Sequence, residues 1–431
     1  MRRVVKVSRI RIIITIIVVV LTTLLTGCTG KEPNEIAYVV ALGIDSTDDD
    51  NYKITIQYAN TTQISGGTSE SGGKAGSEIV DNVTIEAPNI YAGVGLANNI
   101  VSKSFSMSHA KLIVFSKEVA EKGVKDMIET LVRSEEIRPD VFIAVANTTA
   151  NDYLTSVNPE MEVNPAQYYQ LIYQKNQLVG IPDGQLREFF TGLYTDNYDS
   201  ILPVAGVIEG SGGNSQNDDK GQSKDSQNEG SEGSSESLDS FESKNSDENE
   251  KEKDAEKNTS KYEYDIKNYV GGETAIEKKN KAEAIGAAVF EKDKMVGELG
   301  EVETEICKML KGDYTYSYLT YYNNDTPDIP ITVKTTQQKK PKYKIDTDKK
   351  TVDIELYIES DLYSLPADYN VENKIEDFER DVANYTSSTC TEFINNFTKK
   401  YNSDILKLNE KVKYKFLTNN QYNWFKKNVD W

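Results

Sequence analysis

The segment IAYVVALGID (Ile36–Asp45) is a continuous apolar run, which predicts a β-strand buried on both of its faces. The segment YKITIQYA (Tyr52–Ala59) alternates apolar and polar residues, which is typical of a half-buried strand. Between them, STDDDN has the composition of a turn. Its three adjacent aspartates lack the alternating spacing and the glycine of an EF-hand calcium loop. We therefore expect a sheet to begin here, and no calcium site.

Helical and strand patterns alternate over the next part of the chain. Gly93-Val94-Gly95 lacks the third glycine of a dinucleotide-binding loop and follows no clear strand, so it indicates close helix packing. The periodicity predicts helices over Asn89–Lys103, Ser116–Arg133, Asn164–Gln177 and Gly184–Leu193, and strands over Lys111–Phe115, Asp140–Asn147 and Ile201–Glu209.

A polar segment then interrupts the pattern. Within residues 211–260 the apolar side chains are only Leu238, Phe241 and Ala255, against 14 acidic and 6 basic residues. So few apolar groups cannot offset the entropy lost on folding. We interpret residues 210–261 as a disordered polar linker or insertion.

Regular patterns return after this segment. EAIGAAVFEKDKMVGELGEVET (Glu283–Thr304) predicts a hairpin followed by a helix. TVDIELYIE (Thr351–Glu359) alternates strictly and predicts a strand, and apolar residues at helical spacing predict a long helix at about 372–401.

Strands grouped with helices that cover their faces describe an α+β protein with mixed or antiparallel sheets. We expect several domains, divided as 1–27 (signal peptide), 28–209 (an N-terminal α+β region of one or two domains), 210–261 (linker) and 262–431 (a C-terminal α+β domain).

The charge distribution argues against one class of partner. The formal net charge is −20, although the extreme N-terminus is basic. A body this acidic repels phosphate backbones, so we expect no nucleic-acid binding.

The N-terminus has the features of an export signal. Five basic residues within positions 1–11 precede the apolar run Ile12–Leu25, which is shorter than the ~20 residues of a membrane-spanning helix. Leu25, Thr26 and Gly27 before Cys28 resemble the lipobox of bacterial lipoproteins. That resemblance implies cleavage between Gly27 and Cys28 and a diacylglyceryl group on the Cys28 thiol, often with an acyl group on the new amino terminus. A retained anchor helix is the alternative.

The sequence offers little that indicates catalysis. His109 is the sole histidine, so it has no second histidine with which to share a zinc ion, and we expect it to make local hydrogen bonds. Walker, HExxH, GxSxG and CxxC motifs are absent. Acidic pairs are too abundant among 69 acidic residues to indicate a two-carboxylate hydrolase. We expect no enzymatic activity, cofactor or metal.

Cys307 and Cys390 are expected to be buried, with one disulfide as the alternative.

Two aromatic segments have open interpretations. The tyrosines of DYTYSYLTYY (313–322) suit either a partner interface or the cover of a sheet face. The closing WFKKNVDW has aromatic and basic residues at helical spacing, which favours a helix packed on its own domain over a membrane or partner contact.

Taken together, several segments resemble the Ger(x)C family, the lipoprotein C subunits of spore germinant receptors. The most specific is the pattern AVF-x-x-DK-x-VG-x-L. The matching segments are NEIAYVVALGID (Asn34–Asp45), SHAKLIVFSKEVAEKGV (Ser108–Val124), LVRSEEIRPD (Leu131–Asp140), IGAAVFEKDKMVGEL (Ile285–Leu299), YNSDILKL (Tyr401–Leu408) and WFKKNVDW (Trp424–Trp431). The chain departs from the family pattern at Thr29–Lys31, at Ser116–Glu118 and in the length of its polar insertion.

The resemblance implies three unlike α+β domains without known catalysis. It implies a lipid-anchored subunit on the outer face of the spore inner membrane, acting with an integral-membrane A subunit and a transporter-like B subunit in nutrient-triggered germination. Two alternatives come from other classes. A solute-binding lipoprotein of a transporter would need a cleft between two similar lobes, and a cell-wall hydrolase would need carboxylates converging in a groove.

Overall fold

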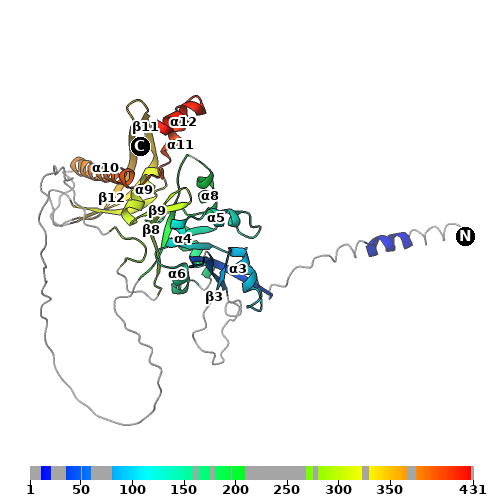
Figure 1. Ribbon diagram of the computed structural model, residues 1–431. Coiled ribbons are helices and arrows are strands. Elements are labelled where there is room, and N and C mark those ends of the chain that lie inside the picture. Colours follow the sequence, from blue (N-terminus) through cyan, green and yellow to red (C-terminus); the bar gives the residue numbers. More distant parts are fainter. Residues whose placement is uncertain are drawn as a thin grey trace, which may run out of the picture.

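The computed structural model describes residues 11–20, 35–49, 51–59, 80–158, 162, 165–174, 180–195, 197–208, 268–274, 280–322, 330–365 and 375–428. Residues 11–20 form an exposed helix, and the remaining ranges form the folded body (Figure 1). The polar segment 210–261 lies outside the described residues, and so do Gly27 and Cys28.

A nine-stranded mixed sheet is the centre of the body. Its main path runs β3-β2-β1-β5-β6-β7-β8-β9, and β4 pairs with β1 off this path. The pairs from β1 through β5 and β6 to β7 are parallel, and the pairs toward both edges are antiparallel. The strands are β1 (Ile36–Ser46), β2 (Tyr52–Ala59), β3 (Val80–Ala87), β4 (Ser104–Ser106), β5 (Leu112–Ser116), β6 (Phe142–Ala146), β7 (Ile201–Val207), β8 (Ala282–Glu291) and β9 (Lys294–Leu299).

Helices cover both faces of this sheet, because its central strands are apolar on both sides. One face packs under α3 (Ile90–Ala97), α4 (Lys117–Lys122), α5 (Lys125–Val132) and α8 (Leu186–Tyr194). The other face packs under α6 (Ala150–Ser156) and α7 (Pro165–Gln174). The prediction that Ile36–Asp45 forms a strand buried on both faces is confirmed.

Three predictions in this part differ from the structure. The helix expected over Asn89–Lys103 ends at Ala97, and turns then lead into β4. The helix expected over Ser116–Arg133 is two helices, α4 and α5, because Gly123 has φ 118°, which a helix cannot contain. Strand β2 is buried on both faces at its centre, where a half-buried strand was expected. Gln57 is accommodated there because it donates to the Leu154 carbonyl and accepts from the Tyr169 hydroxyl.

The predicted hairpin is β8–β9, and it extends the same sheet. Strand β8 pairs antiparallel with β7, with Ile201 opposite Val289 and Val207 opposite Ala282. The sheet therefore crosses from the region 28–209 into the region 262–431, and the limits of the domains remain predictions.

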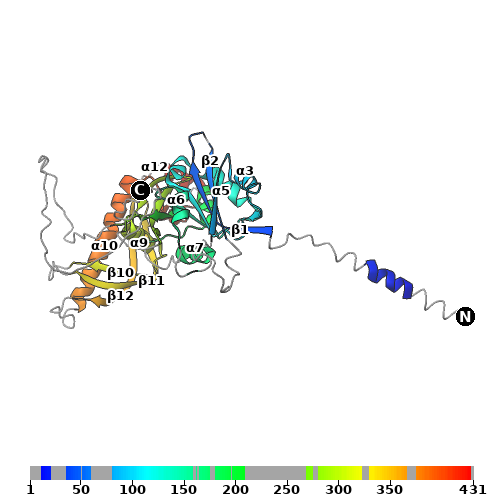
Figure 2. The same cartoon turned by 90° about the horizontal axis from the view of Figure 1, so that it is seen from below.

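A smaller antiparallel sheet lies beside the first, in the order β10-β11-β12. Its strands are β10 (Tyr316–Tyr321), β11 (Ile331–Asp346) and β12 (Thr351–Ser364), and its helices are α9 (Glu301–Lys311) and the long α10 (Ile375–Lys400). Figure 2 shows α10 running along this sheet. Mixed and antiparallel sheets with helices packed on them confirm the α+β class.

The tyrosine-rich segment is divided between buried and exposed positions, and its use as a partner interface stays a prediction. Tyr314 and Tyr321 are buried beneath the helices. Tyr318 is 54% exposed on the outer face, where its ring lies 5.1 Å from that of Tyr363.

The C-terminal helices are α11 (Leu408–Lys413) and α12 (Asn419–Asn428). Tyr422 and Phe425 are buried, so α12 packs on its own domain as favoured above. Cys307 and Cys390 are buried free cysteines, which confirms the expectation for them.

Gly206→Ala tests the close approach of β7 to residues 268–274. A methyl group at Gly206 would overlap the backbone of Gly271 and Gly272, which cannot yield as a flexible side chain can. We expect a loss of about 1–3 kcal/mol in the free energy of unfolding, measured by urea denaturation. Gly95→Ala is the matched control, because Gly95 has open space around it in α3, and it should gain about 0.5–1 kcal/mol. Equal effects of the two substitutions would contradict this packing.

Candidate functional site

The predicted anchor residues Gly27 and Cys28 fall outside the described residues, so the lipobox remains a prediction from the sequence. Among the helices of the described part of the chain, none has both the length and the apolar character needed to cross a membrane. The first described strand, β1, begins at Ile36, shortly after the expected anchor.

Two contacts are described for His109, one with its neighbour in the chain and one with a residue of β1. Its Nδ1 lies 3.0 Å from the Ser108 hydroxyl, and its ring meets the ring of Tyr38 edge-on at 4.7 Å. This arrangement fits the expected local hydrogen bonding. In the described ranges, three or more histidine, cysteine or acidic side chains do not converge on any point that could hold a metal ion.

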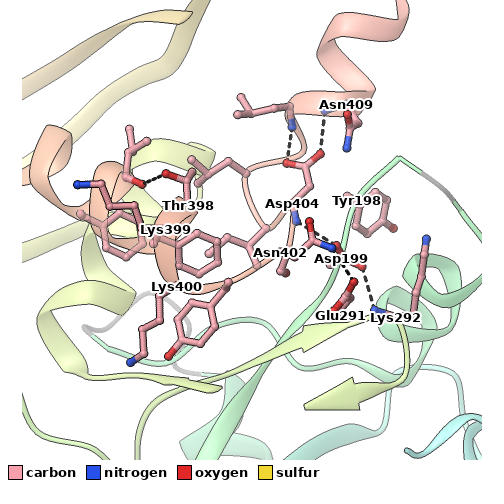
Figure 3. A pocket seen from close by; sticks show the side chains of 18 of the residues that line it. Tyr198, Asp199, Glu291, Lys292, Thr398, Lys399, Lys400, Asn402, Asp404 and Asn409 are labelled. Atoms are coloured by element: carbon pink, nitrogen blue, oxygen red, sulfur yellow. Dashed lines mark hydrogen bonds between the residues drawn. The ribbon is translucent and has the colours of Figure 1, made fainter. Parts of the chain in front are cut away.

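The most elaborate polar site lies where the segment 401–409, after α10, meets the β8–β9 hairpin (Figure 3). Its central residue is Asp404, whose two carboxylate oxygens accept from the backbone N–H groups of Leu408 and Asn409, both at 2.8 Å. These bonds cap α11, because the residue before that helix, Lys407, has φ 57° and supplies no side-chain cap. Asp404 therefore holds the start of the C-terminal helices.

A second carboxylate connects this segment to the large sheet. Asp199, which precedes β7, accepts from the backbone N–H of Asp404 and from that of Lys292, both at 2.9 Å. Lys292 lies in the turn of the hairpin and also donates from Nζ to the Thr195 carbonyl at 2.7 Å. One side chain thus fixes three parts of the chain that are far apart in sequence.

Further bonds from the same segment hold the hairpin itself. Ser403 donates to the Phe290 carbonyl at 2.7 Å, and Asn402 donates to the Glu291 carboxylate at 2.8 Å. The Tyr401 ring lies directly against Gly297, where any side chain would overlap it. The segment Tyr401–Leu408 (YNSDILKL) therefore holds the hairpin segment Ile285–Leu299 (IGAAVFEKDKMVGEL) by hydrogen bonds and by packing of the Tyr401 ring.

Beside these contacts is a cavity of about 610 Å³ with mixed charge on its walls. The charged residues on its walls include Asp199, Glu291 and Lys292. Outside the lining, Lys407 lies 4.3 Å from the centre of the Tyr198 ring and 3.2 Å from a Glu188 oxygen. Burial raises the pKa of Asp404, although its backbone hydrogen bonds and nearby Lys411 act in the opposite direction.

The polar groups of this site hold separate parts of the chain together. Both oxygens of Asp404 and both oxygens of Asp199 accept backbone N–H groups that folding has to satisfy. These carboxylates hold the C-terminal segment, the hairpin and β7 together. We call this set, residues 199, 290–292, 297 and 401–409, the joint.

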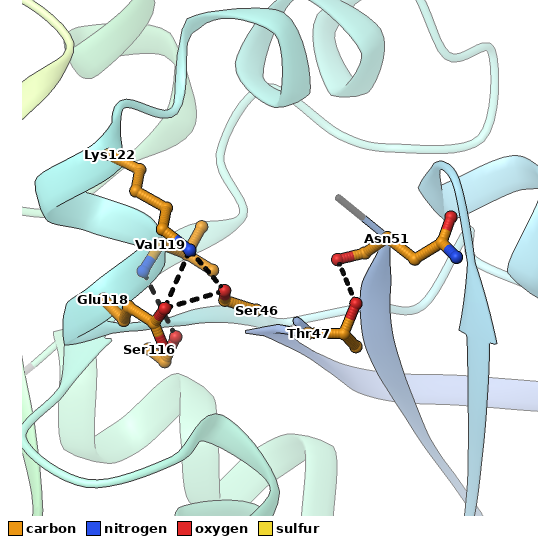
Figure 4. A network of polar contacts seen from close by, with 7 residues as sticks. All are labelled: Ser46, Thr47, Asn51, Ser116, Glu118, Val119 and Lys122. Carbon is orange, nitrogen blue, oxygen red and sulfur yellow. Dashed lines mark hydrogen bonds and ion pairs between the residues drawn. The ribbon is translucent and has the colours of Figure 1, made fainter. Parts of the chain in front are cut away.

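A second polar network joins the end of β1 to α4 (Figure 4). The Lys122 ammonium contacts both Glu118 and Ser46 at 2.7 Å, and Ser46 donates to Glu118 at 2.9 Å. Next to it, Lys117 pairs with Glu298 at 2.9 Å. The segment that departs from the family pattern at Ser116–Glu118 therefore still docks α4 on β1 and on β9.

Sequence reasoning singled out the segment around Asp404 but not Asp199. Asp199 stands in a short polar connection with no periodic pattern, so only its three-dimensional position identifies it.

Two protein-family models match the chain and together cover more than half of it. "Spore germination protein N-terminal domain" matches residues 30–207, and "Spore germination B3/ GerAC like, C-terminal" matches residues 285–431. The chain belongs to the spore germination GerAC/B3-like family. The resemblance inferred from the sequence motifs is thereby confirmed at the level of family.

Individual relatives are more distant. The chain is 26% identical over 174 residues to "Spore germination protein KC" of Bacillus subtilis (strain 168), which covers 37% of this chain and 42% of that protein. It is 29% identical over 145 residues to "Putative spore germination protein YfkR" of the same organism, covering 33% of this chain and 37% of that protein. The matched stretch thus spans less than half of either relative. A solved structure, "Crystal Structure of the GerBC protein", aligns with a TM-score of 0.46 at 14% identity, over 90% of this chain and 91% of that one.

Asp404→Ala tests the joint. Removing the carboxylate leaves two N–H groups of α11 without their acceptor, so the free energy of unfolding should fall by about 1–2 kcal/mol. The measurement is chemical denaturation followed by circular dichroism. Glu392→Ala, on the exposed side of α10, is the matched control and should stay within about 0.5 kcal/mol of the unaltered protein. An Asp404→Ala variant as stable as the control would remove the structural role assigned to this residue.

Proposed function

We propose that this protein is the lipid-anchored, non-enzymatic C subunit of a nutrient germinant receptor, required for spore germination. The observation that carries the proposal is that the two family models match in order, over residues 30–207 and 285–431, and the first begins directly after the lipobox-like sequence that ends at Cys28.

The proposed anchor is a diacylglyceryl group on Cys28, with cleavage after Gly27. It is supported by the basic residues, the apolar run and the small residues that precede the cysteine. Two or three acyl chains hold a protein on a membrane stably, where one chain is marginal. We propose the outer face of the spore inner membrane as the location of the body, as the family resemblance implies.

The proposed partners are the A and B membrane subunits of the receptor. Lipidation confines the body to the plane in which those subunits lie, which raises its effective concentration there. A modest intrinsic affinity for the partners is then sufficient for assembly.

The carboxylates of the joint, Asp199 and Asp404, have a structural role, because their oxygens accept backbone N–H groups. The matched family is one of spore germination proteins, and this favours a receptor subunit over a transporter's solute-binding protein.

Cys28→Ala is the direct test of the anchor. Without the acceptor thiol no acyl chain is added, so the amount of protein sedimenting with membranes should fall about tenfold or more. Germination in response to nutrients should be impaired in parallel. Cys390→Ala, which alters a buried cysteine far from the anchor, is the matched control and should remain in the membrane fraction. A Cys28→Ala variant that stays membrane-bound and functional would show that the anchor is elsewhere.

A further inference from the structure

The segment from Ala87 to Ser102 forms an uncharged surface on an acidic protein. Its sixteen residues include no charged side chain, whereas the chain as a whole carries a net charge of −20. Three large apolar side chains of this segment are exposed to solvent: Tyr91 by 40%, Leu96 by 49% and Ile100 by 69%. We call these three residues the α3 patch.

The α3 patch is held in a fixed conformation. Ile90, Val94 and Ala97 anchor α3 in the core of the large sheet. After the helix, the backbone N–H of Ile100 donates to the Ala97 carbonyl at 3.0 Å, and Asn98 accepts from the N–H of Phe105 at 2.8 Å. Leu96 and Ile100 are therefore exposed in an ordered part of the structure.

The patch lies at the end of the body where the chain enters from the N-terminus. Strand β4 begins at Ser104, four residues after Ile100, and Ser104 pairs directly with Ile36, the first residue of β1. Figures 1 and 2 both place α3 on the side of the body where β1 begins.

The length of the connection to Cys28 limits how far this end can be from a membrane. Eight residue steps separate Cys28 from Ile36, which span at most about 29 Å when fully extended. We infer that the α3 patch is a second, non-covalent membrane contact, in which Tyr91, Leu96 and Ile100 enter the headgroup region of the bilayer. This inference rests on the lipid anchor of the proposed function.

The residues of the α3 patch favour insertion of apolar side chains into the bilayer over attraction to anionic lipid headgroups. The neighbouring cavity has Glu135 and Glu136 on its other wall beside Arg133, so the surroundings supply no excess of positive charge. An uncharged surface loses little hydration when it meets the interface, and exposed leucine, isoleucine and tyrosine gain from entering it. The contact should therefore form on zwitterionic vesicles and persist at high salt.

The test uses the full acylated protein, purified from membranes and reconstituted on phosphatidylcholine vesicles. Leu96→Cys provides a site for an environment-sensitive fluorophore, since Cys307 and Cys390 are buried and Cys28 is acylated. We expect a blue-shifted emission that doxyl-labelled lipids quench, at low and at high salt alike. A label introduced by Tyr318→Cys, on the outer face of the small sheet, should report an aqueous environment.

A matched pair of substitutions isolates the apolar contribution. In the Leu96→Cys background, Ile100→Asp should abolish the blue shift and the quenching, because it adds a charge within the patch. Ser102→Asp adds the same charge at an exposed polar position two residues away and should leave both signals in place.

The outcomes separate this inference from the proposed function. If the protein floats with vesicles while the label at position 96 behaves like the one at position 318, the anchor stands and the membrane contact is wrong. A blue shift that salt abolishes, or that Ser102→Asp removes as fully as Ile100→Asp, would also overturn apolar insertion. If no variant floats with vesicles, the lipid anchor is wrong and the patch contact falls with it.

Discussion

The antiparallel pairing of β7 with β8 is the interaction on which the rest of the structure depends. It joins strands that are separated by residues 208–281 in the chain, and both are almost wholly buried. Because β9, α9 and the small sheet follow β8 directly, this pairing positions the entire C-terminal part against the N-terminal part. The chain must close a long loop to form it, and the buried apolar surface of the two strands offsets that entropy.

The joint depends on this pairing and reinforces it. Once β8 is in place, the hairpin presents Lys292 and Gly297 to the segment 401–409, and Asp199 comes within reach of Asp404. Two of the segments by which the family is identified, Ile285–Leu299 and Tyr401–Leu408, therefore meet at one place. Their residue types are explained by contact with each other: glycine where the Tyr401 ring lies, and aspartate where backbone N–H groups need acceptors.

Much of the fold follows from local patterns in the sequence. The apolar runs of β1, β5 and β6 and the spacing of α10 are strong signals, and the structure contains each of these elements. The break at Gly123 was missed because helical periodicity continues across it, and the sheet-spanning β7–β8 pair was missed because strand pairing across a long polar segment leaves no periodic trace. Burial of Gln57 depends on partners supplied by α6 and α7, which the pattern of β2 alone does not specify. Asp404 could be found through its family motif, whereas Asp199 becomes visible only through its hydrogen bonds.

The two family-matched parts share one sheet, in which β7 and β8 pair directly. Native-state hydrogen exchange on β7 and β8 tests this most directly, because amides that open in one cooperative unit exchange with the same free energy. We predict equal and high protection for both strands, above that of β12 at the edge of the small sheet. Amides of β8 that exchange through a much smaller opening free energy than those of β7 would contradict it, since the two parts would then be independent units.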